Sequence, residues 1–363
     1  MRVTRKSSSK HSINKKKDIE SALDGLLGEG FHGKIYRLDP HLKGQTLNSL
    51  YANKRIIKIK LYTDDHTEEI YLTEQNDISD FLAFLLTRKG VIAKVFKSTF
   101  LMTGVTKQQE LENELFINKK VMKYYGSAAS RFLTIAPIKG FRNYKIVGCY
   151  IETAKDGTLF IAFGSECDNN YSMNIHKMAV DILESLVHLQ EAGYQHNDIK
   201  LDNVVRCGGK YKLIDWGQAC SIEEFKFGDM MCTNPLKWYI KGIPAYFSQH
   251  FMDYRVSMVN SGYEKSSVFQ EKNKQIIEEF KSIVSSKPDL HELNKKYKRN
   301  FDVFMLGMTM LHAVYKFNLK YERYQELIGR MTSLTHPWTS AKEALNYTKK
   351  YLDRVQTVSK SKN

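Results

Sequence analysis

The segment "YQHNDIKLDNVVRCGGKYKLIDWGQA", residues 194–219, places polar side chains at fixed intervals between short apolar runs. The polar side chains are those of His196, Asp198, Lys200, Asn203 and Asp215. Two apolar pairs, Val204-Val205 and Leu213-Ile214, indicate buried strands. The pattern therefore predicts that buried strands bring several polar groups to one point.

The types of these side chains suit one kind of chemistry. Asp198 can orient a hydroxyl group, and Lys200 can neutralise developing negative charge. Asn203 and Asp215 offer oxygen ligands of the kind that Mg²⁺ takes together with substrate phosphates. These are the parts that phosphoryl transfer needs, so the segment predicts a phosphoryl-transfer site if a phosphate cradle lies elsewhere.

A glycine-rich stretch near the start of the chain can supply that cradle. The sequence "LLGEGFHGKIY", residues 26–36, contains Gly28, Gly30 and Gly33 in the pattern G-x-G-x-x-G. Glycines allow the backbone to approach phosphate oxygens closely. Strand-like residues on both sides and the absence of a following helical pattern favour a glycine-rich hairpin over a dinucleotide-binding turn.

Composition limits the class of protein and its partners. The chain of 363 residues has 55 Lys and Arg against 40 Asp and Glu, a formal net charge of +15. This excess favours polyanionic partners, although basic residues gathered in solvated ends explain much of it. Residues 1–20 and 351–363 are predicted to be basic tails, the first of them disordered and open to weak polyanion contacts.

Cysteine usage and apolar runs indicate an intracellular protein, cytoplasmic or nuclear and not secreted. Five widely spaced cysteines show no zinc spacing and no pairing logic, which is typical of a reducing compartment. The basic N-terminus has no apolar run behind it, so it does not resemble a secretory signal. No stretch approaches the roughly 18 apolar residues of a membrane span.

Periodicity predicts an α+β protein in two lobes. From Gly25 to about Glu152 the signals are mostly strand-like, including residues 55–62 and 91–96, with one helix over 107–125. After Asn169 helices dominate. A helix over 173–193 is predicted to end at Gly193, and a helix over 301–315, apolar nearly all round, is predicted to be buried.

The chain resembles the eukaryotic-type protein kinases from about residue 25 to 350, with the motifs in their usual order. The family's H-R-D-x-K-x-x-N corresponds to H-N-D-I-K-L-D-N from His196 to Asn203, and its D-F-G to D-W-G from Asp215. The many Lys, Asn and Tyr residues and the insertions are similar to those of divergent kinases encoded by large DNA viruses. The resemblance implies a bilobal kinase-like fold with the active site between a strand-rich N-terminal lobe and a mainly helical C-terminal lobe.

The resemblance also implies domain limits. The kinase domain would cover residues 21–350. Its N-lobe would run over about 21–165 with an insertion at about 38–88. Its C-lobe would run over about 166–350 with an insertion at about 249–298.

By the same resemblance, Asp198 would be the catalytic base and Lys200 the residue that stabilises charge. Asn203 and Asp215 would bind the metal, and the glycine-rich hairpin would cover ATP. The cofactors implied are ATP and Mg²⁺, with Mn²⁺ as an alternative. A lysine at position 200 is more similar to serine/threonine kinases than to tyrosine kinases, so protein substrates with hydroxyl groups are the implied partners.

The family's V-A-I-K lysine and its partner glutamate have more than one match. "VIAKVF", residues 91–96, offers Lys94, and Glu114 follows on the predicted helix, with Glu112 as its neighbouring alternative. Lys58 or Lys60 in "RIIKIKL" is the rival lysine, with a surface strand of outward lysines as the simpler explanation. Glu114 follows Lys94 by twenty residues on a predicted helix, whereas no comparable helix with an inward glutamate follows Lys58 or Lys60 at that distance. This spacing favours Lys94.

Other family positions are matched in part. Phe163 would guard the adenine pocket, with backbone from Gly164 to Cys167, including Glu166, facing the base. Asp302 in "DVFMLG" would hold the backbone of the catalytic loop. The segment 233–246 stands where A-P-E belongs but lacks the glutamate, and "HPWTSAKEALNY", residues 336–347, lacks the arginine that pairs with it.

Two other classes of function fit parts of the sequence. Small-molecule phosphotransferases such as antibiotic and choline kinases share the Asp, Asn, Asp arrangement, but they usually lack a lysine at the position of Lys200. A pseudokinase scaffold or a basic nucleic-acid-binding module would need no catalytic set, yet Asp198, Asn203 and Asp215 are all present.

Overall fold

The computed structural model describes residues 24–29, 33–37, 56–63, 69–86, 91–96, 111–112, 115–116, 138–153, 157–165, 167, 172–215, 219–222, 267–285 and 299–360. The chain divides into two compact units. Unit 1 comprises residues 1–116 and 134–166, and unit 2 comprises residues 117–133 and 167–363. A strand-rich sheet and a set of helices confirm the predicted α+β class. The predicted N-terminal tail lies outside the described residues.

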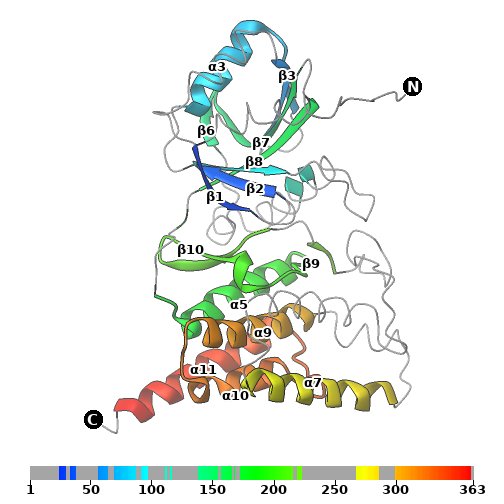
Figure 1. The fold of residues 1–363 in the computed structure, drawn as a ribbon, viewed down its shortest axis with the longest axis vertical. Coiled ribbons are helices and arrows are strands. Elements are labelled where there is room, and N and C mark those ends of the chain that lie inside the picture. Colours follow the sequence, from blue (N-terminus) through cyan, green and yellow to red (C-terminus); the bar gives the residue numbers. More distant parts are fainter. Residues whose placement is uncertain are drawn as a thin grey trace, which may run out of the picture. The chain divides into compact units, whose positions relative to one another are not determined.

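Unit 1 is built on one antiparallel sheet, with eight strands among the described residues. The order along the sheet is β1-β2-β5-β8-β7-β3-β4, and β6 pairs with β7 (Figure 1). The strands are β1 Asp24–Glu29, β2 Gly33–Arg37, β3 Ile56–Thr63, β4 Glu69–Leu72, β5 Val91–Phe96, β6 Ile138–Phe141, β7 Tyr144–Thr153 and β8 Gly157–Ser165. The strands predicted over 55–62 and 91–96 are therefore present as β3 and β5.

The core of unit 1 lies on one face of this sheet. Alternate residues of β3, Ile59 and Leu61, are fully buried there, as is Cys149 of β7. The helix α3, Gln75–Leu86, packs onto the same core, and the rings of Phe81 and Phe141 meet edge to face with centroids 5.2 Å apart. Burial of such alternate apolar side chains fixes the register of the sheet, since a shift by one residue would expose them.

The stretch expected to be an insertion, 38–88, carries ordered structure in its described part. It contributes β3, β4 and α3. β3 pairs with β7, and β4 pairs with β3, so the two strands extend the sheet beyond β7. These elements therefore enlarge the sheet, and α3 covers one of its faces.

Unit 2 contains the polar segment of residues 194–219 between helices. The helix α5, Ile175–Glu191, begins at the N-cap Asn174, whose side chain accepts the backbone N–H of Lys177 at 3.0 Å. Just past the C-cap of α5, Gly193 has a φ of +84°, a left-handed conformation that glycine adopts without strain. After this turn come β9 Tyr194–Gln195, the 3-10 helix η2 Leu201–Asn203, and the strands β10 Val204–Cys207 and β11 Lys210–Leu213.

The helix α9, Phe301–Lys316, lies at the centre of unit 2. Its side chains are buried continuously from Phe301 to Val314, which confirms the predicted buried helix. α9 packs against α5, α10 Gln325–Met331 and α11 Ala341–Lys360 (Figure 1). A Cβ at Gly307 would lie 2.7 Å from Met331 Cβ, so the close approach of α9 to the end of α10 requires a glycine.

Two predictions about unit 2 need correction or addition. Residues 351–360 continue α11 as a helix, so they do not form a separate tail. The second expected insertion, 249–298, contains a helix α7, Ser267–Ser285. Glu279 of α7 accepts the backbone N–H of Leu334 at 2.7 Å, which links α7 to the turn after α10. Within the described residues, none of the helices combines the length and apolarity needed to cross a membrane.

Candidate active site

The loop from His196 to Asn203 in unit 2 is anchored by one buried carboxylate. Asp302 of α9 is 1% exposed, and its two oxygens accept the backbone N–H groups of His196 at 2.8 Å and Asn197 at 2.9 Å. Burial raises the pKa of Asp302 to about 6, although the two N–H groups oppose this rise. The contact predicted for Asp302 with the loop backbone is confirmed.

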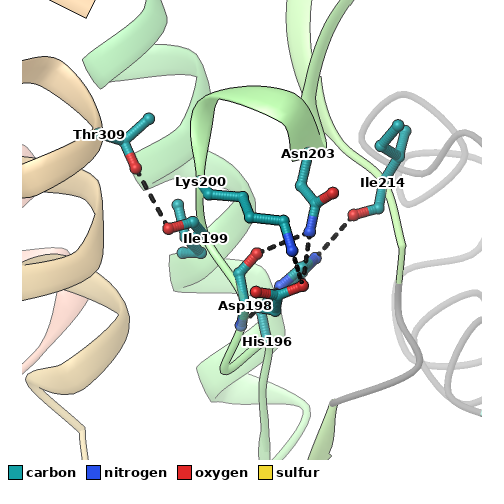
Figure 2. A network of polar contacts seen from close by, with 7 residues as sticks. All are labelled: His196, Asp198, Ile199, Lys200, Asn203, Ile214 and Thr309. Carbon is teal, nitrogen blue, oxygen red and sulfur yellow. Dashed lines mark hydrogen bonds and ion pairs between the residues drawn. The ribbon is translucent and has the colours of Figure 1, made fainter. Parts of the chain in front are cut away.

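His196 connects the loop to the end of β11. Its Nδ1 accepts the backbone N–H of Asp198 at 3.3 Å, and its Nε2 lies 3.2 Å from the carbonyl oxygen of Ile214 (Figure 2). The two contacts together require the tautomer with hydrogen on Nε2, since a carbonyl can only accept. His196 thereby fixes the distance between the backbone at Asp198 and the residue before Asp215.

The carboxylate of Asp198 is the centre of a polar network. Its Oδ2 accepts hydrogen bonds from Lys200 Nζ at 2.8 Å and from Asn203 Nδ2 at 2.8 Å (Figure 2). Asn203 Nδ2 also donates to the backbone oxygen of Asp198 at 2.9 Å. Lys200 and Asn203 therefore hold Asp198 in one orientation from two sides, a role for Asn203 that the sequence did not predict.

The charges in this network shift the pKa values of its members. Burial raises the pKa of Asp198, and the nearby charge of Asp215 adds to the rise, against the lowering effect of Lys200. Burial alone would lower the pKa of Lys200, but the Asp198 carboxylate outweighs it and raises this pKa. A carboxylate with a raised pKa is a stronger base than one in water, while Lys200 remains protonated beside it.

The predicted metal ligands lie at the base of the hairpin formed by β10 and β11. The backbone N–H of Ile214 donates to the carbonyl of Asn203 at 3.0 Å, which brings Asn203 close to Asp215. Because Nδ2 of Asn203 is turned toward Asp198, its Oδ1 points away from that carboxylate (Figure 2). An amide oxygen and a carboxylate are both ligands of the kind that a hard cation such as Mg²⁺ takes.

A site of three or more metal-binding His, Cys, Asp or Glu side chains is not found among the residues that the structure describes. The predicted pair, Asn203 and Asp215, supplies one amide and one carboxylate and so does not form such a cluster. A metal held by this pair would take its remaining ligands from phosphate oxygens and water. Asp215 has a φ of +68°, and Asp is among the few residues that tolerate this conformation. Trp216 and Gly217 of the D-W-G motif lie outside the described residues.

The glycine-rich strands of unit 1 lie next to Lys94. In the β1–β2 pair Gly28 is opposite Ile35, and Gly33 of β2 is opposite Phe96 of β5. Lys94 of β5 pairs with Ile35, so the strand that carries Lys94 is the direct neighbour of the glycine-rich hairpin. Gly30 lies outside the described residues.

The face of the sheet to which Lys94 belongs follows from the register. Lys94 pairs with Ala162 of β8, and Ala162 pairs with Gly148 of β7, so these three positions share one face. A Cβ at Gly148 would lie 3.2 Å from Leu115 Cδ1 and 3.6 Å from Leu111 Cδ1. The segment that carries these leucines therefore packs on the face of Lys94.

That segment is part of the helix predicted over 107–125, of which residues 111–112 and 115–116 are described and helical. Glu114 lies outside the described residues. The alternative glutamate, Glu112, accepts a hydrogen bond from the hydroxyl of Tyr62 of β3 at 3.4 Å. The predicted pairing of Lys94 with Glu114 stays a prediction.

The rival lysines lie elsewhere in the sheet. Lys58 and Lys60 belong to β3, which is separated from the glycine-rich hairpin by β5, β8 and β7. Lys60 pairs with Glu69 of β4 at 2.6 Å, and Lys58 lies over the ring of Tyr71 at 4.8 Å. Both lysines are partly buried and have partners on the neighbouring strand β4.

Phe163 lies in the hydrophobic core of unit 1. Phe163 pairs with Ala93, is 1% exposed and belongs to the hydrophobic core on the face opposite Lys94. Strand side chains alternate, so Ala162 and Gly164, and not Phe163, share the face of Lys94. The predicted part of Phe163 at an adenine pocket stays a prediction. Glu166 lies outside the described residues.

Two contacts of the site were not predicted at all. Thr309 Oγ1 of α9 donates to the carbonyl of Ile199 at 3.2 Å, a second link between α9 and the loop (Figure 2). A disulfide joins Cys167 to Cys207, although the spacing of the cysteines in the sequence did not indicate which of them would pair. Threonine in an apolar helix and cysteines 40 residues apart carry no periodic signal that would have revealed these contacts.

Comparison with known proteins adds little to this site. The chain matches no family model and no curated protein. One solved structure that it resembles, that of WbdD, is 16% identical over 40% of this chain and 31% of that one, so the chain spans about a third of its length. The TM-score of 0.25 is too low for the likeness to bear on fold or function.

Proposed function

We propose that the chain is an ATP-dependent serine/threonine protein kinase with a bilobal kinase-like fold. The observation that carries the proposal is the Asp198 carboxylate, held by Lys200 and Asn203 above the buried anchor Asp302. Support also comes from Lys94, which lies on the strand next to the glycine-rich hairpin. Protein hydroxyl groups are the proposed acceptors, and ATP is the proposed donor.

Each residue of the network has a defined part in the proposed reaction. Asp198 accepts a hydrogen bond from the acceptor hydroxyl and takes its proton as the hydroxyl oxygen bonds to the γ-phosphorus. The bond between the γ-phosphorus and the bridging oxygen breaks, and ADP leaves. Lys200 places a positive charge beside the transferred group, where negative charge is spread over the phosphoryl oxygens.

Asn203 Oδ1 and Asp215 would hold Mg²⁺, which neutralises phosphate charge when it is bound. The geometry of Asn203 suits this double role, because its amide nitrogen orients Asp198 and its oxygen points away. Lys94 would contact the α- and β-phosphates. The proposed compartment is the cytoplasm or the nucleus.

The test is incubation of the full-length protein with γ-labelled ATP, Mg²⁺ and a generic protein substrate. We expect label on protein serine or threonine, and a loss of about 10²- to 10⁴-fold in Asp198→Asn, the range for removal of a general base. Calorimetric ATP binding should stay close to normal in that variant, because Asp198 does not contact the nucleotide. Asp202→Asn is the matched control, since Asp202 is exposed on the same 3-10 turn.

Other outcomes would replace the proposal with a different function. Transfer of label to choline or an aminoglycoside but not to protein would indicate a small-molecule phosphotransferase. ATP binding without transfer to any acceptor would indicate a pseudokinase scaffold. Wild-type turnover in Asp198→Asn would overturn the proposed base.

A further inference from the structure

The disulfide between Cys167 and Cys207 joins two segments that matter to the site. Cys167 lies two residues beyond the end of β8, and Cys207 is the last residue of β10. Their Cα atoms are 4.6 Å apart, within the range that a disulfide spans. Both side chains are half-buried, so small thiols and disulfides in solution can reach them.

Cys207 sits at the tip of the hairpin whose base carries Asn203 and Asp215. Gly208 and Gly209 have φ values of +56° and +77°, the two consecutive positive values of a tight hairpin turn. In this turn Cys207 is directly opposite Lys210, and Val204 is opposite Leu213 at the other end of the hairpin. A disulfide at the tip therefore restrains the pairing of β10 with β11, and this pairing positions both predicted metal ligands.

The charges around Cys207 favour thiol–disulfide exchange. Cys207 shares its face of the hairpin with its partner Lys210 and with Lys212, which is two residues further along. Burial lowers the pKa of Lys212, and the positive charge of Lys210 lowers it further, so the two ammonium groups repel each other. A thiolate on this face would relieve the repulsion, and a thiolate is the form that attacks a disulfide.

We propose that Cys167 and Cys207 form a reversible redox tie that controls the rigidity of the β10–β11 hairpin. The oxidant is a low-molecular-weight disulfide such as oxidised glutathione. Cys207 attacks it and releases one thiol, and Cys167 then attacks the mixed disulfide and releases the second. Two protein thiols lose two electrons and two protons, and one glutathione disulfide becomes two glutathione molecules.

The first measurement is of the bond itself. The full-length protein is equilibrated in glutathione buffers from fully reduced to fully oxidised, quenched in acid, alkylated and digested. Mass spectrometry should show a Cys167–Cys207 cross-linked peptide that rises with the oxidised fraction and disappears in the reduced buffer. Absence of this peptide in the oxidised sample, or its persistence in the most reducing buffer, would overturn the proposal.

The second measurement is of the hairpin and needs no catalytic activity. Hydrogen exchange of a peptide spanning 203–214 should be at least about tenfold slower in the oxidised protein, because a cross-link restricts local opening. A peptide from α11 should not change. Cys167→Ser and Cys207→Ser should each abolish the redox dependence, while Cys232→Ser should retain it. Equal exchange in both redox states would contradict control of the hairpin even if the bond forms.

Discussion

Asp302 shows how much of the site rests on a single buried residue. Its carboxylate accepts the backbone N–H groups of both His196 and Asn197. Each of these residues is at most 1% exposed, so water does not replace the carboxylate as their partner. A buried polar group without a partner costs about 1–3 kcal/mol, so Asp302 stabilises the loop mainly by keeping two N–H groups satisfied.

The raised pKa of Asp302 predicts a specific pH dependence of stability. Its folded-state pKa of about 6 lies above the ordinary value of 3.8, so the folded protein binds the proton more tightly than the unfolded chain. The stability that this group contributes is fully present below pH 3.8 and is lost as the pH rises through 6. The loss amounts to roughly 3 kcal/mol at 1.36 kcal/mol for each unit of pKa difference.

Asp302→Asn lacks this titration. Urea unfolding of both proteins from pH 4 to 7.5 should show that the advantage of the wild type over Asp302→Asn falls by roughly 2 to 3 kcal/mol as the pH rises. Asp202→Asn, at an exposed position, should show no such change. A difference between wild type and Asp302→Asn that stays constant with pH would contradict the raised pKa.

At the scale of elements, the order of strands separates the two candidate lysines. β5 lies between the glycine-rich strand β2 and β8, whereas β3 lies on the far side of β7. A single flexible side chain on β3 would have to cross three intervening strands, each about 4.8 Å wide, to reach the glycine-rich hairpin. The position of β5 therefore favours Lys94 as the phosphate-contacting residue.

Lys94→Met should lower kcat/KM for ATP by about 10²-fold or more, the usual effect of removing one electrostatic contact to the reacting group. Lys60→Met should change activity little, because Lys60 pairs with Glu69 of β4 and three strands separate β3 from the glycine-rich hairpin. Steady-state kinetics and thermal unfolding of both variants are the measurements. A larger loss of activity in Lys60→Met would move the nucleotide site to β3.

The sequence predicted those elements whose signal is local. β3 and β5 have runs of apolar and β-branched residues, which favour strands. α9 is apolar nearly all round over sixteen residues, which favours a buried helix. Asp198, Lys200 and Asn203 lie within six consecutive residues, so their closeness in sequence alone keeps them near one another in the structure.

The sequence could not predict features that depend on partners distant along the chain. The face to which Phe163 belongs depends on the pairing of β8 with β5, in which Phe163 is opposite Ala93. The continuous apolar run from Leu159 to Phe163 has no alternation that would show this face. The disulfide and the extension of the sheet by β3 and β4 are likewise tertiary. Glu279 of α7 is a further example, because it caps Leu334, which lies 55 residues away.

At the scale of the whole molecule, the residue before the proposed base Asp198 bears on regulation. In the family that the chain resembles, an arginine there receives a phosphate on the activation loop. Here the position is Asn197, which is 1% exposed and has a φ of +62°. Asn tolerates this conformation better than most residues, so a local backbone requirement accounts for it. A buried, uncharged amide cannot make the charge-assisted bidentate contact that arginine offers to phosphate.

The proposed kinase is therefore expected to be active without phosphorylation of the segment from Cys220 to Pro244. Phosphatase-treated protein should keep most of its initial rate, and Ser221→Ala and Thr233→Ala should each change the rate less than about twofold, as expected where no phosphate receptor is formed. Thr233 lies outside the described residues, and Ser221 belongs to the short strand β12, Cys220–Ser221, which pairs with β9. Lys226 and Lys237 are two of the three lysines in that segment and could receive a phosphate instead, so their double replacement by Met is the matched control and should also be silent. A tenfold or greater loss of rate on dephosphorylation, restored by rephosphorylation of either residue, would show that a phosphate orders this segment despite Asn197.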